Sequence, residues 1–234
     1  KDNMPSIDDA IINNDISSMQ SFFEDADDSH IRGRWGQNIL ISATSYNQLE
    51  IIALSLEKGV NVNAQDKNGR TPLLIAIDNN NLKAMELLIA NGADINIRNK
   101  SGHIPLISAS WCNNLDSMHL LLKHGANVNA QDNVGHTSLT QAIVWDNLNS
   151  IQLLLDNGAD INICDKGGYT SLIQAVSSNS LNAMKLLLEK GVDVNACDNK
   201  GKTALIQSTI DNRLEAIITL VKWGADINRS EERR

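Results

Sequence analysis

Cysteine is scarce in this chain, which has only Cys112, Cys164 and Cys197 in 234 residues. So few thiols, and an odd number of them, exclude a fold held together by a disulfide framework. Unpaired thiols are typical of a reducing compartment, so we expect a cytoplasmic location. Secretion into a host cell, or export after removal of a signal peptide, stays open as an alternative.

Long apolar runs and an excess of positive charge are also lacking. No stretch of about 18 apolar residues occurs, so we expect no insertion into a membrane. Lys and Arg number 20 against 28 Asp and Glu, which gives a formal net charge of −8. This balance disfavours nucleic acid or an anionic membrane surface as a general partner.

Motifs that mark catalytic or cofactor sites are missing as well. The chain has no Gly-rich phosphate-binding loop, no paired-cysteine metal spacing and no His-Glu helix motif. His103 and His136 are 33 residues apart, but the pattern places no third ligand near them. We therefore expect no enzyme activity, no cofactor and no bound metal.

What the chain has instead is one pattern that recurs along nearly its whole length, shown well by Asp66–Arg98. Thr71 is a good N-cap for a first helix that runs to about Asp78. Leu82–Asn91 has the apolar ridge of a second helix. Gly92 follows it, at the position where the end of a helix favours a residue with left-handed backbone conformation. The pattern predicts a helix, a tight turn, a second helix and an extended loop.

Four columns of this pattern keep a step of 33 residues. One loop glycine recurs at Gly36, Gly69, Gly102, Gly135, Gly168 and Gly201. The glycine after the second helix recurs at Gly59, Gly92, Gly125, Gly158, Gly191 and Gly224. The other two columns are Asn63, Asn96, Asn129, Asn162, Asn195 and Asn228, and Leu40, Leu73, Leu106, Leu139, Leu172 and Leu205. A fixed period of this length is the signature of a stacked repeat solenoid.

The residues Gly-Arg-Thr-Pro-Leu at 69–73, Leu-Leu at 87–88 and Gly-Ala-Asp-Ile-Asn at 92–96 resemble the ankyrin repeat family. The resemblance implies an all-α solenoid of stacked helix-turn-helix units with β-hairpin-like loops. It also implies a non-enzymatic protein-protein interaction module, with a concave groove formed by the loop tips and the exposed ends of the first helices. The histidine that often follows Thr-Pro-Leu in the family is replaced here by Leu74, Ile107, Thr140, Ile173 and Ile206.

We divide the chain into repeats at the 33-residue period. Residues 1–32 are expected to form a degenerate N-terminal capping repeat. Six full repeats follow, at 33–65, 66–98, 99–131, 132–164, 165–197 and 198–230. The last is expected to be a C-terminal cap, because Ser208, Thr209 and Thr219 stand in columns that are mostly apolar or alanine elsewhere. Residues 231–234 are expected to be a short tail.

Aromatic residues are few, at four Trp, two Tyr and two Phe. Five of them fall in the columns that the resemblance assigns to the binding groove, namely Trp35, Tyr46, Trp111, Trp145 and Tyr169. Large aromatic rings are unfavourable on a solvent-exposed surface, and they are enriched as anchors in protein interfaces. We therefore predict that they bind a protein partner. The alternative for any single ring is local packing on a neighbouring repeat.

Polar residues in the same columns complete the predicted site, and they are Arg34, Arg70, Lys100, His103 and His136. Basic loop tips on an otherwise acidic protein favour a partner with an acidic surface. The alternative is that these lysines are ordinary turn residues with no role in binding. We expect the protein itself to be a monomer.

Two other functions stay open at this point. The chain is compatible with an inhibitor or immunity protein that blocks a partner enzyme. It is also compatible with the targeting part of a longer secreted bacterial effector.

Overall fold

The computed structural model describes residues 5–228, which form fifteen helices and no strand. The predicted all-α repeat solenoid is confirmed. The chain divides into two compact units, Lys1–Ala126 (unit 1) and Asn127–Arg234 (unit 2). The first residues of the predicted N-terminal cap, the end of the last repeat and the predicted tail at 231–234 lie outside the described residues.

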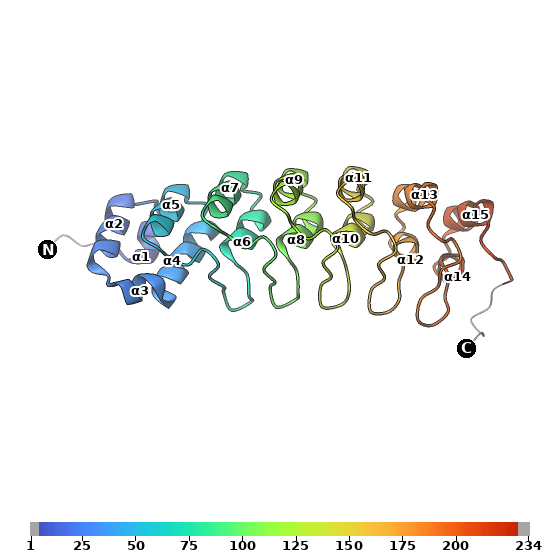
Figure 1. The fold of residues 1–234 in the computed structure, drawn as a ribbon, viewed down its shortest axis with the longest axis horizontal. Helices are drawn as coiled ribbons and strands as arrows, with labels where there is room; N and C mark the ends of the chain where they lie inside the picture. Colours follow the sequence, from blue (N-terminus) through green and yellow to red (C-terminus); the bar gives the residue numbers. More distant parts are fainter. Residues whose placement is uncertain (1–4, 229–234) are drawn as a thin grey trace. The chain divides into compact units, whose positions relative to one another are not determined.

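Unit 1 is a stack of helix pairs. It contains α1 (Ile7–Ile12), α2 (Ile16–Asp25), α3 (Asp28–Arg32), α4 (Arg34–Ser45), α5 (Leu49–Glu57), α6 (Pro72–Asp78), α7 (Leu82–Ala90), α8 (Pro105–Trp111) and α9 (Leu115–Lys123). The first helices α4, α6 and α8 pack in sequence, and so do the second helices α5, α7 and α9. Figure 1 shows these as two rows, with the loops projecting beyond the row of first helices.

Unit 2 repeats this arrangement. It contains α10 (Ser138–Val144), α11 (Leu148–Asp156), α12 (Ser171–Ser177), α13 (Leu181–Glu189), α14 (Ala204–Ile210) and α15 (Leu214–Lys222). First helices again pack on first helices, and the loops project from their row (Figure 1).

The first helices begin at a capping threonine in most repeats. The Thr71 hydroxyl accepts a hydrogen bond from the backbone N–H of Leu74, and Pro72 occupies the first turn, where no N–H is needed. In unit 2 the Thr137 hydroxyl accepts from the N–H of Thr140. These caps explain why the first helices start at a fixed place in the 33-residue period.

The tight turn between the two helices of a pair needs a left-handed residue, with φ between 52° and 58°. This residue recurs every 33 positions, at Asn14, Asn47, Asn80, Asn113, Asp146, Asn179 and Asn212. Asn and Asp adopt this conformation more readily than other residues with a side chain. The turn therefore directs each second helix back along the first.

Leucines of the second helices fill the core of each unit. Leu88 and Leu121 in unit 1, and Leu154 and Leu187 in unit 2, are fully buried. Each such side chain contributes roughly 1.5–3 kcal/mol through removal of its apolar surface from water. Because no single repeat can bury this face alone, the stack depends on its neighbours.

Side-chain hydrogen bonds join successive repeats at the asparagine column. In unit 1 the Asn63 side-chain oxygen accepts from the backbone N–H of Asp94 at 2.8 Å. In unit 2 the Asn129 oxygen accepts from the N–H of Asp160 at the same distance. The invariance of this column along the chain is thus explained by a repeated contact between layers.

The loop tips are also joined, through the backbone. The N–H of Lys100 donates to the carbonyl of Asn68 in unit 1, at 3.1 Å, and the N–H of Lys166 donates to Val134 in unit 2, at 2.9 Å. Gly135, with φ +96°, lies so close to this contact that an added Cβ would be 2.7 Å from the Lys166 nitrogen. The glycine is required both by its backbone conformation and by this close approach.

The first full repeat differs from the prediction at its loop. Arg34 and Trp35 stand in columns that form the loop tip in the other repeats, but here they belong to α4, which has twelve residues where α6 has seven. The helix begins after Gly33, so Asn38, which stands in the column of the capping threonine, lies inside α4. The short helix α3 takes the place of the loop.

Candidate functional site

Three aromatic residues lie exposed where first helices end. Tyr46 is the C-cap of α4 and is 54% exposed, and Trp111 is the last residue of α8 and is 52% exposed. Both belong to unit 1. In unit 2 Trp145 is the C-cap of α10 and is 54% exposed. The end of a first helix, followed directly by the left-handed turn, thus holds a large ring at the surface.

The other two predicted rings are only partly exposed. Trp35 packs edge-on against Phe23 of α2, with ring centroids 5.6 Å apart, which corresponds to the local-packing alternative. Tyr169 is half-buried in the loop before α12, where its N–H donates to the Asp165 carboxylate at 2.9 Å. These two rings therefore offer less surface than the first three.

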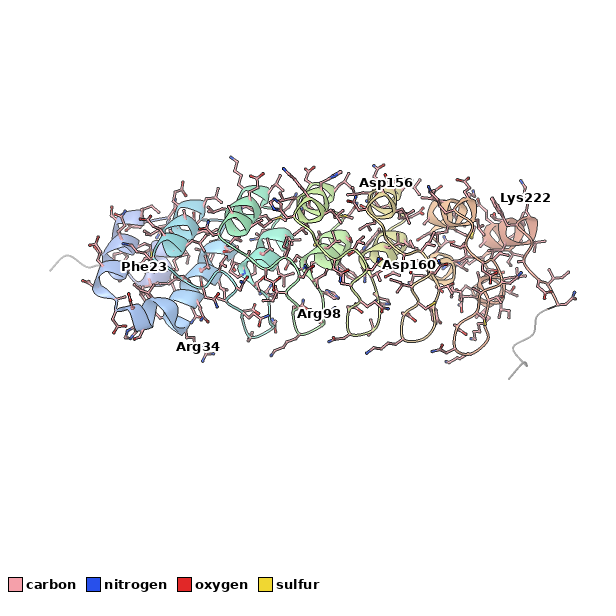
Figure 2. All side chains as sticks on the ribbon, in the orientation of Figure 1. Phe23, Arg34, Arg98, Asp156, Asp160 and Lys222 are labelled. Carbon is pink, nitrogen blue, oxygen red and sulfur yellow. The ribbon has the colours of Figure 1, made fainter. Side chains whose placement is uncertain are left out.

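The predicted basic residues differ in how far they are engaged. Arg70 is held by Asp66, because its Nε donates to Oδ2 at 2.9 Å. Partial burial acts to raise the pKa of Asp66, but hydrogen bonds from Arg70 and Asn68 outweigh it and lower the pKa. Arg34 and Lys100 have exposed side chains, and Figure 2 shows Arg34 at the loop edge of unit 1.

The two predicted histidines belong to different units and have different surroundings. His103 is half-buried in unit 1, and its backbone N–H donates to Asn99 at 3.0 Å. His136 in unit 2 has Nδ1 3.7 Å from Asp132 and Nε2 3.8 Å from Asp165. When its imidazole is protonated, His136 therefore bridges two carboxylates of successive loops.

A hollow of about 190 Å³ lies between α6 and α8 of unit 1. It brings together two predicted side chains, Arg70 and His103, with the predicted ring of Trp111. The remaining lining residues are Leu74, Asp78, Asn99, Ser108 and Cys112. Predicted site residues from two columns and two successive repeats thus meet at one place in unit 1.

Asp78 in this hollow was not among the predicted site residues. Burial raises the pKa of its carboxyl group, although Arg70 and His103 act to lower it. Burial, and secondly the Asp78 charge, likewise raise the pKa of the Cys112 thiol, whose sulfur is 4.0 Å from an Asp78 oxygen. The signal that could have identified Asp78 is its position 33 residues before Trp111, at the same helix end in the preceding repeat.

A second group of exposed apolar side chains lies on the last repeat of unit 2. Leu214 and Ile218 of α15 are 68% and 60% exposed, and Trp223, the C-cap of α15, is 46% exposed. In the repeat before, Lys185 and Lys190 occupy the columns of Ile218 and Trp223. This surface is distinct from the ends of the first helices.

Residues 5–228 contain no group of three or more His, Cys, Asp or Glu side chains placed to hold a metal ion. Over the same residues, every helix is too short or too polar to cross a membrane.

Comparison with known proteins points to one family. A family model described as "Ankyrin repeats (3 copies)" matches residues 7–99, 92–165 and 139–231. These matches overlap and extend over both units. A search of curated proteins found no relative that matches the chain.

Proposed function

The chain belongs to the ankyrin repeat family, whose members are generally protein-protein interaction modules, and from this premise we propose that it binds a protein partner through the ends of its first helices. The proposal applies to each unit by itself. Tyr46 and Trp111 are the anchors in unit 1, and Trp145 is the anchor in unit 2. The family is typically a non-enzymatic scaffold, and we assign no catalytic role to the chain.

The observation that supports this proposal is the exposure of these three rings. Each is more than half exposed, although most large apolar side chains of the same repeats are buried. Tyr and Trp lose little conformational entropy when a partner fixes them, since each has two side-chain torsions. Covering a half-exposed ring also removes much apolar surface from water, which makes such residues effective anchors.

Charge at the loop edge favours a partner with acidic side chains. Arg34 and Lys100 are exposed there in unit 1, and Lys166 is exposed at a loop tip of unit 2. Complementary charges at the rim of an interface accelerate association and fix its orientation. Arg70 contributes less to this rim because Asp66 already holds its guanidinium group.

The proposal is tested by capture of the partner from a lysate of the source organism on the immobilised chain, with identification by mass spectrometry. Trp111→Ala and Trp145→Ala, each truncating an anchor, should each cost about 2 kcal/mol or more in binding. The affinity for the identified partner, measured by titration calorimetry, should then fall by roughly 30-fold for each change.

Trp223→Ala is the matched control, because it removes an exposed Trp that lies away from the proposed surface. It should leave the affinity unchanged. If the double variant Trp111→Ala and Trp145→Ala binds the same partner as tightly as the unmodified chain, the ends of the first helices are not the binding surface.

A further inference from the structure

The charges around the hollow of unit 1 do not balance. Arg70 is the one Lys or Arg among the described residues that line it, and Asp78 is the one acidic residue. The Arg70 Nε is 2.9 Å from Asp66, whereas its Nη1 is 3.9 Å from Asp78. Because the closer pair is formed with Asp66, Arg70 offsets the negative charge of Asp78 only in part, although Arg70 and His103 both act to lower the pKa of that carboxyl group.

Asp78 stands at an unfavourable place for a carboxylate. It is the last residue of α6, where the negative end of the helix dipole opposes its charge. Its carboxylate lies 3.9 Å from the Arg70 guanidinium and 4.0 Å from the Cys112 sulfur. The Asp78 side chain is 45% exposed, so a ligand that enters the hollow can reach its carboxylate directly.

The space on the other side of Asp78 is acidic too. A second hollow, of about 340 Å³, is lined by Asp78 and by Asp116 of α9. No Lys or Arg is among the described residues that line it. A positively charged group that approaches Asp78 from the second hollow therefore meets net negative charge, and from the first it meets Asp66 and Asp78 against the single charge of Arg70.

The Trp111 ring supplies the second half of a cation site. It lines the same hollow as Asp78, on the adjacent helix α8. An aromatic face attracts a cation, and a guanidinium group both stacks on such a face and pairs with a carboxylate through two parallel hydrogen bonds. The hollow, at about 190 Å³, is below the roughly 300–1,000 Å³ that holds a drug-sized ligand, and so suits a single side chain.

We propose that this hollow binds an arginine side chain of the protein partner, with Asp78 pairing to the guanidinium group and Trp111 stacking on its plane. The inference rests on the proposed function and specifies the chemistry of one anchor residue on the partner. The partner needs only one basic side chain at this point of its surface. Acidic residues elsewhere on the same surface would face the exposed lysines and Arg34.

Indole N–H signals of the ¹⁵N-labelled full chain provide a direct test. The signal of Trp111 is assigned as the one lost in Trp111→Phe, and the probe is the peptide acetyl-Gly-Arg-Gly-amide. The Trp111 signal should shift and saturate as the peptide is added. Asp78→Asn should weaken this binding by about tenfold or more, because a hydrogen-bonded charge pair is replaced by a neutral amide.

Asp156→Asn is the matched control variant. Asp156 is also the last residue of a helix and is exposed, as Figure 2 shows, but it lies in unit 2 and lines neither hollow. Binding of the arginine peptide should be unchanged in this variant. Circular dichroism checks that every variant keeps its helices.

Three further peptides define what overturns the inference. With Gln in place of Arg the Trp111 shift should be lost, and with Lys it should be weaker. A glutamate peptide that binds better than the arginine peptide would assign the hollow to Arg70 and an acidic ligand. No saturable shift with arginine, an equal shift with Gln, tighter binding of Lys, or unchanged binding by Asp78→Asn would each also disprove the proposal.

These measurements separate this inference from the proposed function, because they need no partner. If the arginine peptide fails to bind while Trp111→Ala still weakens capture of the partner, the surface assignment stands and the arginine site is wrong. If the peptide binds but neither Trp variant affects the partner, the arginine site stands and the proposed function is wrong.

Discussion

The residue that ends each first helix differs in character between the two units. In unit 1 this column holds Ser45, Asp78 and Trp111. In unit 2 it holds Val144, Ser177 and Ile210. The left-handed residue of the following turn is nevertheless Asn or Asp throughout. The backbone of the repeat is thus fixed by one set of columns, while the helix-end column varies in character, and only unit 1 places a charge there.

The largest expected effect tests whether the two units share one scaffold. Leu88→Ala in unit 1 and Leu154→Ala in unit 2 remove equivalent side chains that are fully buried. Each should lower the free energy of unfolding by about 2–5 kcal/mol, because the cavity cannot close completely. Urea unfolding of the two variants, with hydrogen exchange followed for each unit, measures the losses. A loss below about 1 kcal/mol in one unit alone would show that the cores are not equivalent.

Much of this scaffold could be predicted from the sequence, because the same local signals recur in every repeat. The first helix was expected from Thr71 to about Asp78 and is found at Pro72–Asp78, and the second was expected at Leu82–Asn91 and is found at Leu82–Ala90. Caps, apolar periodicity and the terminal glycine are local features, so one sequence suffices to read them.

The hollow could not be predicted, because it depends on how neighbouring repeats pack. Trp111 was predicted as an anchor from its column, but nothing local showed that Asp78 lies beside it or that Asp66 holds Arg70. Local packing was left open as the alternative for any single ring, but the sequence did not show that Trp35 is the ring concerned or that Phe23 is its partner, since that contact joins α2 and α4. Contacts between layers emerge only once the repeats are stacked.

The second prediction concerns the left-handed turn. Asp146 in unit 2 accepts from the N–H of Ala183 at 2.6 Å and from the Asn182 side chain at 2.8 Å. The side-chain oxygen of Asn80 in unit 1 accepts one hydrogen bond within residues 5–228, from the Asn114 side chain. Asp146→Ala should therefore cost about 2–4 kcal/mol and Asn80→Ala about 1–2 kcal/mol, since alanine also disfavours the left-handed backbone.

Glycine at the same two positions separates the backbone from the side chain. Asp146→Gly and Asn80→Gly keep the left-handed turn but remove the acceptor. If the larger loss of stability in unit 2 arises from the hydrogen bonds of Asp146, the two glycine variants show the same difference in free energy of unfolding when they are unfolded in urea. If it disappears, the turn conformation alone is responsible.

The third prediction uses the charge that only unit 1 carries in the helix-end column. Burial raises the pKa of Asp78 in the folded protein, so the folded state binds a proton more readily than the unfolded state. The Asp78 contribution to stability is therefore present at low pH and is lost as the pH rises through its folded pKa. Asp78→Asn, which removes this group, should raise the Tm at pH 7.

The comparison across pH makes this prediction specific. The Tm difference between Asp78→Asn and the unmodified chain should shrink toward zero as the pH falls below about 4, the ordinary range of an aspartate. Ser177→Asn, at the same column of unit 2, should show no pH-dependent difference. A Tm at pH 7 that falls in Asp78→Asn would mean that the long contact with Arg70 outweighs burial.

The smallest expected effect compares one ion pair in each unit. Arg70 and Asp66 have side chains that are 43% and 15% exposed, whereas Lys185 and Glu215 of unit 2 are 48% and 61% exposed. Double-mutant cycles with alanine should give a coupling of about 1 kcal/mol for the first pair and below about 0.5 kcal/mol for the second. Added salt should reduce the coupling energy of the Lys185–Glu215 pair more, because its charges are more exposed to ions in solution.

This last comparison also bears on the hollow. A strong coupling between Arg70 and Asp66 means that the guanidinium group stays with Asp66 and leaves Asp78 to attract a positive ligand. If the coupling is no greater than that of the exposed pair in unit 2, Arg70 is free to turn toward Asp78. The charge of the hollow is then neutralised from within, and an arginine of the partner would gain nothing by entering it.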